Sequence, residues 1–377
     1  MSEATALPKT IEEYHGYYLQ RLYAIINAYG ARGASDVHIL PDDGIYSVTQ
    51  GVLLRDLSPR AVVSHAEVAE WLRQPNQQGE ASDEILNQTG HVSLAFDTGV
   101  YRIRGSFRRT SHGVSVTFRI VPHLVPEAQN MGVPLAIQEL AKRSAGLILI
   151  VGPTGSGKTT TIAALIDQLN RTTDQHFYLI EDPIEFVHVP LGNSVFTQRE
   201  IGEHAVDFAS AIENALRSKP NVIVIGELLS APAARAALRA ATTGHLVITT
   251  AHAGSVAEAL ENYVGQFAEG EQSLIRSRLS QSLLAVMVQK LVPAIGGGLV
   301  AAREVMVNSQ NFRELIRDPH KINMVNQQLQ SSAGCNTLED SLLSLVREGK
   351  ITAVTATEHA MNMEAIVDGL LRMEAKK

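Results

Sequence analysis

The sequence predicts an α/β protein with two parts, a parallel sheet wrapped by helices and, before it, a smaller α+β domain. In the larger part, apolar runs alternate with helical segments, as parallel sheets require; the runs are residues 147–151, 177–181, 222–226 and 246–250. In the smaller part, short runs of alternating polar and apolar residues follow one helix, which indicates an antiparallel sheet. Ligands of parallel α/β sheets bind at the carboxyl ends of the strands, so functional residues are expected there.

The smaller domain is expected to span residues 1–120. Its helix is predicted over residues 11–29, and its strands are predicted at residues 36–40, 45–49, 91–97, 101–107 and 114–120. Residues 121–134 contain three prolines and no hydrophobic period, which predicts a linker with a hinge.

The parallel-sheet core is expected over residues 135–307, with a turn at residues 296–298 between its last strands. Residues 308–377 are expected to be helical, because apolar residues recur there at helical spacing. They are Leu342, Leu343, Leu345, Val346, Ala360, Met361, Met363 and Ile366. These residues are predicted to form the packing faces of a helical bundle.

Residues 152–159 are the most informative segment of the chain. They read Gly-Pro-Thr-Gly-Ser-Gly-Lys-Thr and match the phosphate-loop pattern G-x-x-x-x-G-K-[ST] at every position. A predicted strand precedes them and a predicted helix, residues 160–167, follows them, which is the order that the motif requires. The alternative, a Gly/Thr-rich turn without a ligand, leaves this complete match unexplained. The segment therefore predicts a site for a nucleoside triphosphate.

The roles within this loop follow from its chemistry. Its glycines let successive N–H groups face phosphate oxygens at the start of the helix. Lys158 would neutralise the β- and γ-phosphates, and Thr159 would hold Mg²⁺ as the predicted metal ligand. The predicted ATP-binding residues are Gly152, Pro153, Thr154, Gly155, Ser156, Gly157, Lys158, Thr159 and Thr160.

Composition narrows the classes of function. Hydrophobic residues make up 45% of the chain and charged residues 19%, which suits folded domains. The net charge of −7 disfavours broad nucleic-acid binding, so no direct nucleic-acid contact is expected and a nucleic-acid translocase is the weaker alternative. The single cysteine, Cys335, allows no intramolecular disulfide and fits a cytoplasmic location. No apolar run has the length of a membrane span, so no membrane insertion is expected.

Carboxylates end two of the predicted strands. Glu227 follows the strand at residues 222–226, where an acid polarises attacking water or holds the metal through water. Glu181, Asp182 and Glu185 lie at the end of another predicted strand, residues 177–181, and three acids so close repel one another unless a cation or a proton lies among them. Bound Mg²⁺ would supply that cation. The alternative for these three acids is a solvated acidic turn.

Histidines flank the predicted strand at residues 246–250. His252, at its carboxyl end, is predicted to reach the phosphates and respond to the γ-phosphate, whereas His245, at the other end, is predicted to fix a turn.

Three arginines lie on predicted strands of the smaller domain. Arg102 and Arg104 share one face by alternation, and Arg119 lies opposite the apolar face of its strand. Without further context, surface arginines are usually solvated. Gathered on one sheet surface, they would need an anionic partner, and the ATP of a neighbouring subunit would serve as one.

Several motifs resemble those of the secretion ATPases that power type IV pili and type II and type IV secretion, most closely their PilT-like branch. Residues 33–38 resemble the A-S-D-L-H signature, and residues 180–185 resemble the acidic box. Thr243-Gly-His245 and Ala251-His252-Ala253 resemble the two parts of the histidine box. Residues 310–317 resemble the A-I-R-N-L-I-R motif of pilus-retraction motors. The motifs occur in the family's order, and the likeness extends over nearly the whole chain after about residue 30.

The resemblance implies a homo-hexameric ATPase that uses ATP and Mg²⁺. Each subunit would carry a PAS-like N-terminal domain and a RecA-like ATPase domain, joined by a mobile linker. In this family, arginines of the N-terminal domain complete the ATP site, and Arg104 and Arg119 match them best. The ring would work in the cytoplasm, docked on the inner-membrane platform of a secretion, conjugation or pilus machine.

Two departures from the retraction motors bear on the subtype. Residues 228–230 read Leu-Leu-Ser where the family commonly has Met/Leu-Arg-Asp, and residues 310–317 match the retraction motif only in part. These departures favour a DotB- or TraJ-like motor of type IVB secretion or conjugation. A PilT-like retraction ATPase is the alternative. An alternative of another class is a nucleotide-gated scaffold with negligible turnover.

Overall fold

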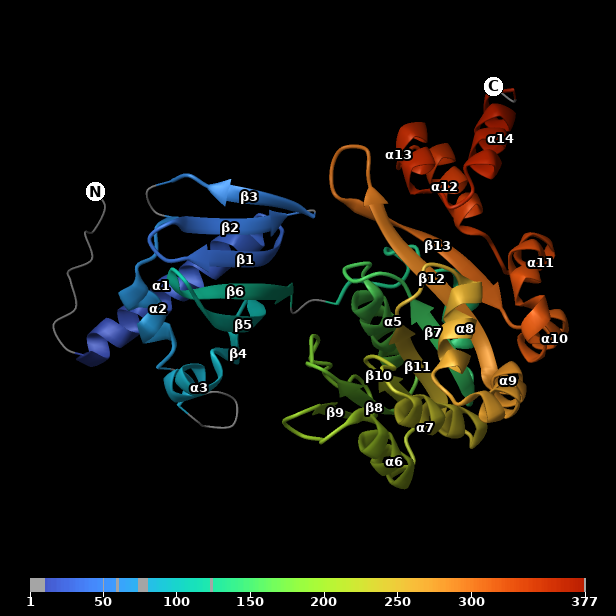
Figure 1. Cartoon of the computed structure of the whole chain (residues 1–377), viewed down its shortest axis with the longest axis horizontal. Coiled ribbons are helices and arrows are strands. Elements are labelled where there is room, and N and C mark those ends of the chain that lie inside the picture. The colour runs from blue at the N-terminus through green and yellow to red at the C-terminus, as the bar shows by residue number, and fades with distance from the viewer. Residues whose placement is uncertain (1–10, 50, 59–60, 74–80, 123–124, 376–377) are drawn as a thin grey trace. The chain divides into compact units, whose positions relative to one another are not determined.

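The computed structural model describes residues 11–49, 51–58, 61–73, 81–122 and 125–375, which fall into two compact units, Met1–Leu124 and Val125–Lys377 (Figure 1). The first unit contains α1 (Ile11–Ala31), β1 (Ala34–Leu40), β2 (Gly44–Thr49), β3 (Val52–Asp56), α2 (His65–Trp71), α3 (Ser82–Thr89), β4 (His91–Asp97), β5 (Tyr101–Thr110) and β6 (Gly113–Pro122).

The first unit is built on a six-stranded sheet with the order β3-β2-β1-β6-β5-β4. Every pair of neighbouring strands is antiparallel. Apolar residues of α1 and α2, including Ile26 and Trp71, form one core with Val37 of β1 and Phe118 of β6, which are direct partners across the sheet. The helices therefore cover one face of the sheet, as the alternating pattern of the strands predicts.

The second unit follows the predicted α/β order. Its strands are β7 (Gly146–Val151), β8 (His176–Glu181), β9 (Val195–Glu200), β10 (Val222–Ile225), β11 (Leu246–Ala251), β12 (Leu283–Pro293) and β13 (Leu299–Val307). Its helices are α4 (Leu135–Leu140), α5 (Lys158–Thr172), α6 (Phe208–Ser218), α7 (Ala231–Thr242), α8 (Val256–Gly265), α9 (Glu269–Ser282), α10 (Gln310–Arg317), the 3₁₀ helix η2 (Pro319–Met324), α11 (Val325–Ser331), α12 (Leu338–Arg347), α13 (Ala353–His359) and α14 (Met363–Glu374).

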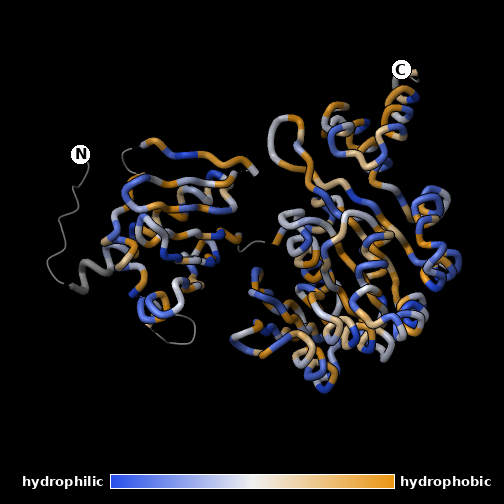
Figure 2. Tube along the Cα trace, in the orientation of Figure 1, coloured by the Kyte–Doolittle hydropathy of each residue, from blue (hydrophilic) through white to orange (hydrophobic). Residues whose placement is uncertain are grey.

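The sheet of this unit has the order β13-β12-β7-β11-β10-β8-β9, and only the β12–β13 pair is antiparallel. Its inner strands are hydrophobic along their length (Figure 2), because both faces are covered. On β7, Leu147 and Leu149 face a core shared with α6 to α9, whereas Ile148 and Ile150 face a core shared with α4 and α5. Because β7, β8, β10 and β11 run parallel, the loops that follow them lie along one edge of the sheet.

The α/β fold and the α+β first unit confirm the predicted fold class, but several elements differ from the expectation. The sequence analysis gave no strand at β3 or β9, and it anticipated β12 and β13 only through the turn at residues 296–298. Strand β9 is a polar edge strand, which gives little hydrophobic signal. Strand β12 begins with an uninterrupted apolar run at residues 283–288, which periodicity alone does not separate from a buried helix.

The structure does not support a linker over the whole of residues 121–134. Strand β6 takes up residues 121–122, and residues 125–134 belong to the second unit. Ala128 and Val133 are buried there in the core that contains Ile148. The prolines in this segment led to the prediction of a linker, but the buried side chains of Ala128 and Val133 attach the segment to the core of the second unit.

The C-terminal region is helical, as expected, and α12 to α14 share a small core with the β12–β13 hairpin. Leu342, Leu345 and Ile366 are buried in it, but Met361 and Met363, expected at packing positions, are exposed. Helix α13 ends at His359 and α14 begins at Met363, so the helical period does not run through these methionines. Within the part of the chain that the structure describes, every helix is too short or too polar to cross a bilayer.

Candidate nucleotide-binding site

The predicted phosphate loop joins β7 to α5, as the motif requires. Gly152, Gly155 and Gly157 have φ angles of 151°, 76° and 81°, a region that favours glycine. A Cβ atom on Gly152 would collide with the backbone oxygen of Gln289 on β12, so no larger residue fits there. The loop is therefore held tightly against the neighbouring strand, while Gly155 faces open space.

Lys158 is the first residue of α5 and is buried at the loop. Its Nζ atom donates hydrogen bonds to the backbone oxygens of Gly152, at 2.8 Å, and Pro153, at 3.0 Å. Burial lowers the pKa of Lys158, and the nearby carboxylates of Glu227 and Glu185 partly oppose that shift. The amine thus lies inside the loop, with two of the predicted acidic residues close enough to act on its charge.

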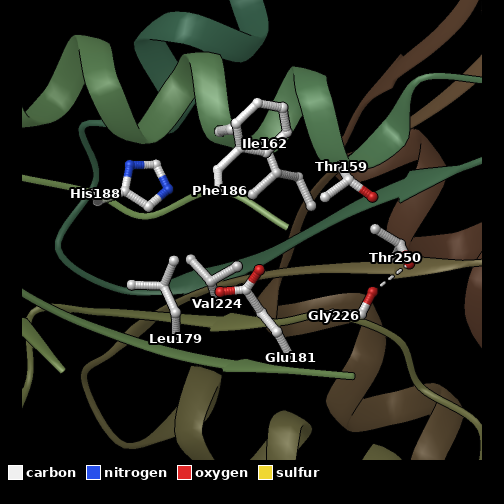
Figure 3. A pocket seen from close by; sticks show the side chains of 10 residues that line it. Thr159, Ile162, Leu179, Glu181, Phe186, His188, Val224, Gly226 and Thr250 are labelled. Carbon is white, nitrogen blue, oxygen red and sulfur yellow. Dashed lines mark hydrogen bonds between the residues drawn. The ribbon is translucent and has the colours of Figure 1, made fainter. Parts of the chain in front are cut away.

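A pocket lies beside the first turn of α5, between this helix and strands β8 and β10 (Figure 3). Its lining residues are Thr159, Ile162, Ala163, Leu179, Glu181, Phe186, His188, Val224, Gly226 and Thr250. Thr159 and Thr250 lie at one end of it and His188 lies at the other. The hydroxyl of Thr250 donates to the backbone oxygen of Gly226, which ties β11 to the end of β10.

The three acids at and after the end of β8 separate instead of clustering. Glu181 is buried and extends into the pocket, where its Oε1 accepts a hydrogen bond from Gln198 at 3.1 Å. Asp182 is exposed, and Glu185 acts on the charge of Lys158. Among the described residues, no group of three acids, histidines or cysteines is placed to hold a metal ion. The expectation of three acids around one cation is therefore wrong, because the chain turns sharply after the strand.

Gln198 on the edge strand β9 is a residue that the sequence analysis missed. Its Nε2 atom donates to Glu181 and to the backbone oxygen of Phe186, and its Oε1 accepts from the backbone N–H of His188. The His188 ring stacks on Phe196 with 5.3 Å between ring centroids. Burial lowers the pKa of His188 to about 4, so its ring is neutral at physiological pH.

Glu227 and His252 form a pair that the sequence analysis did not predict. His252 Nε2 lies 2.6 Å from Glu227 Oε1, an ion pair when the imidazole is protonated. His252 was expected to reach phosphate directly, whereas here it contacts the acid at the end of β10. His245 lies at the other end of β11, with Nδ1 3.3 Å from the backbone oxygen of Ala240, in the turn role expected for it.

Arg104 and Arg119 are direct cross-strand partners on β5 and β6. Both are exposed on the face opposite the helices, and Arg102 lies on the same face by alternation. Arg119 Nε is 3.2 Å from Asp36 Oδ1, whereas Arg104 makes no hydrogen bond or ion pair within the described residues of the chain. Like charges placed directly opposite each other destabilise a sheet, which favours an anion at this position.

The residues of the loop suit phosphate groups. Successive backbone N–H groups at the start of α5 and the Lys158 amine are suitable hydrogen-bond donors for phosphate oxygens. The buried hydroxyl of Ser156 has no hydrogen-bond partner in the described part of the chain. Thr159, the second residue of α5, places its hydroxyl at the edge of the pocket in Figure 3.

Fold and loop together define a RecA-like protein with a phosphate loop. Residues 13–336 match the family described as Type II/IV secretion system protein, and the chain belongs to this family. It is 39% identical over 335 residues to the "Type IV pilus retractation ATPase PilT" of Pseudomonas aeruginosa, a match that covers 87% of this chain and 95% of that protein.

Two solved structures support the same assignment. The crystal structure of the pilus retraction motor PilT with bound ADP is 33% identical, with a TM-score of 0.80, and the match covers 90% of this chain and 97% of that one. The structure of the ATPase DotB of Legionella pneumophila is 26% identical, with a TM-score of 0.77, and the match covers 94% of this chain and 96% of that one.

Proposed function

We propose that the protein is a hexameric, ATP-hydrolysing motor that drives retraction of a type IV pilus. The observation that carries the proposal is the 39% identity to a pilus retraction ATPase over 95% of that protein's length. The complete phosphate loop, with Lys158 inside it and Glu227 acting on its charge, supports the same activity.

The proposed roles of the site residues follow from their positions. Lys158 neutralises phosphate charge, and its backbone partners in the loop are exchanged for phosphate oxygens. Glu227 accepts the proton of the attacking water, and His252 orients the Glu227 carboxylate. Glu181 lies across the pocket from Thr159, and Glu185 adjusts the charge balance at the amine.

Bound Mg²⁺ would neutralise charge that develops on the phosphate oxygens. Thr159 is the residue that would contact it, with the remaining ligands supplied by phosphates and water, as is common for this ion. The absence of an acidic cage among the described residues is compatible with such a site.

Assembly into a ring of six explains the arginine pair. The first unit has no phosphate loop, so Arg104 and Arg119 act on the ATP of a neighbouring subunit. Changes at the ATP site move the first unit through the segment that connects it to the second unit. The ring works at the cytoplasmic face of the inner membrane through a protein platform.

A second candidate is a DotB- or TraJ-like motor of type IVB secretion or conjugation. The observation that favours it is the likeness to DotB over 94% of this chain. The departure at residues 228–230 favours it less, because two of the three residues have local structural roles while Leu229 is exposed. The Ser230 hydroxyl caps the start of α7 and Leu228 is buried in the core.

The two candidates are separated by deleting the gene in a bacterium that has both kinds of machine. Retraction predicts cells with excess pili that lose twitching motility, restored by the wild-type gene and not by its Lys158→Ala variant. Loss of effector or plasmid transfer with normal twitching would support the second candidate and contradict the first.

A further inference from the structure

Gln289 on β12 lies beneath the phosphate loop and is almost wholly buried. Its Nε2 atom donates to the backbone oxygen of Ser156 at 2.6 Å, and its Oε1 accepts from the Thr161 hydroxyl at 3.0 Å. Its backbone oxygen lies where any side chain on Gly152 would have to go. One residue thus touches the beginning and the end of the loop and the helix that follows.

Arg303 is the direct partner of Gln289 across the β12–β13 pair. Its Nε atom donates to Gln289 Oε1 at 2.9 Å, and its Nη1 donates to the backbone oxygen of Gly132 at 2.9 Å. The guanidinium group is buried, and within the described ranges of the chain it forms no ion pair with a carboxylate and its Nη2 atom has no hydrogen-bond partner. Burying a cation against amide and carbonyl oxygens alone is costly, so this arrangement calls for a specific explanation.

Gly132 lies in the segment that leads into the second unit. Strand β6 of the first unit ends at Pro122, and residues 125–134 are held to the core by Ala128 and Val133. The Arg303 guanidinium adds a polar attachment to this segment at its Gly132 end. A continuous set of hydrogen bonds therefore joins the phosphate loop to the segment by which the first unit is attached.

We propose that Gln289 and Arg303 are positioning residues that set the phosphate loop and transmit its nucleotide state to residues 125–134. Gln289 Oε1 accepts from both Thr161 and Arg303, so a displacement of the loop changes both bonds and, through Nη1, the bond to Gly132. The proposal rests on nucleotide binding at this loop.

Hydrogen–deuterium exchange of the full chain, with and without ADP, tests the proposal. In the wild-type protein, ADP is expected to slow amide exchange in residues 152–161 and also to change exchange in residues 125–134. In Arg303→Gln, the shorter neutral side chain still reaches Gln289 but not Gly132. In this variant ADP should still slow amide exchange in residues 152–161, but it should no longer change exchange in residues 125–134.

Gln289→Glu provides a second, independent variant. The carboxylate still accepts from Thr161 and pairs with Arg303, but it cannot donate to Ser156 and it brings negative charge to the loop. The dissociation constant for ADP should rise about tenfold, because one buried hydrogen bond is lost. Lys290→Gln on the same strand is the matched control, since Lys290 Nζ contacts His359 instead of the loop, and it should behave as the wild type.

The outcomes separate this inference from the proposed function. An unchanged ADP response of residues 125–134 in Arg303→Gln, or its absence in the wild-type protein while the loop responds, overturns the coupling. An unchanged dissociation constant in Gln289→Glu overturns the positioning role. If ADP protects neither segment of the wild-type protein, nucleotide binding itself is wrong.

Discussion

His252 Nε2 lies 2.6 Å from Glu227 Oε1, at the carboxyl ends of the neighbouring parallel strands β11 and β10. The pair places the imidazole against the acid that is proposed to take a proton from water, at ion-pair distance, although Glu227 Oε1 has no partner with hydrogen-bond geometry in the described part of the chain. The imidazole is the more exposed partner, with 49% of its side chain accessible against 29% for Glu227. We therefore expect His252 to act through Glu227 and not through direct contact with ATP.

Replacing His252 tests this order of action. His252→Ala should lower kcat roughly tenfold to a hundredfold with little change in KM for ATP, because the carboxylate loses its orientation. His252→Gln retains an N–H donor and should recover part of the rate. A higher KM with an unchanged kcat in His252→Ala would mean that the imidazole binds ATP itself.

Glu227→Gln should preserve ATP binding and lose turnover by at least about a hundredfold, because an amide keeps the shape of the acid but accepts no proton. Single-turnover kinetics and a direct ATP-binding assay measure the two properties separately. Asp182→Asn, which neutralises an exposed acid that follows the neighbouring strand β8, is the control and should have nearly normal turnover. Normal turnover in Glu227→Gln would remove this residue from the mechanism.

Arg104 and Arg119 should act on the next subunit of the ring. Subunits with both arginines replaced by alanine have an intact phosphate loop, and Lys158→Ala subunits have intact arginines. Rings made of one variant alone should be inactive. Mixed rings should regain part of the ATPase activity, because at some interfaces an intact phosphate loop of one subunit meets the intact arginines of the next. No recovery in rings shown to be mixed would indicate that the arginines act within their own subunit or only support the fold.

His188 should make the second unit sensitive to acid. The pKa of His188 is about 4 in the folded protein against an ordinary value of 6.5. Below pH 6.5 the unfolded chain therefore takes up a proton that the folded protein does not, and the free energy of unfolding falls as the pH drops from 6.5 toward 4. The loss amounts to about 3 kcal/mol at most. His188→Phe keeps the stacking on Phe196 and removes the titration, so its stability should fall less over this range.

Urea unfolding followed by circular dichroism measures this effect. The single tryptophan, Trp71, is buried in the first unit, so its fluorescence reports that unit separately. Equal acid sensitivity of wild type and His188→Phe in the second unit would contradict a buried neutral imidazole.

The sequence predicted the parts of the site that are contiguous in the chain. The phosphate loop, its strand and its helix were all legible, because the motif and the hydrophobic pattern occupy one short stretch. Gln289 and Arg303 carry no motif, and their contacts with the loop arise only because β12 lies beside β7 and pairs with β13. Gln198 was missed for the same reason, since an edge strand places it against Glu181.

The sequence was less informative where a local pattern has two physical solutions. Three acids within five residues predicted a shared cation, but the turn after β8 sends Glu181 into the pocket and leaves Asp182 exposed. Likewise, Leu229 and Ser230 suggested a different machine, although Ser230 serves as a helix cap. Both features depend on where the backbone turns, which these patterns do not specify.

The most direct test of the central claim is steady-state phosphate release by the purified full-length protein and its Lys158→Ala variant. The account predicts ATP-dependent release by the wild-type protein and a loss of about a thousandfold in the variant, because the charge that faces the phosphates is removed. The variant should unfold at nearly the same temperature as the wild type. Negligible release by correctly assembled wild-type rings, or comparable release by both proteins, would contradict an ATP-hydrolysing motor at this loop.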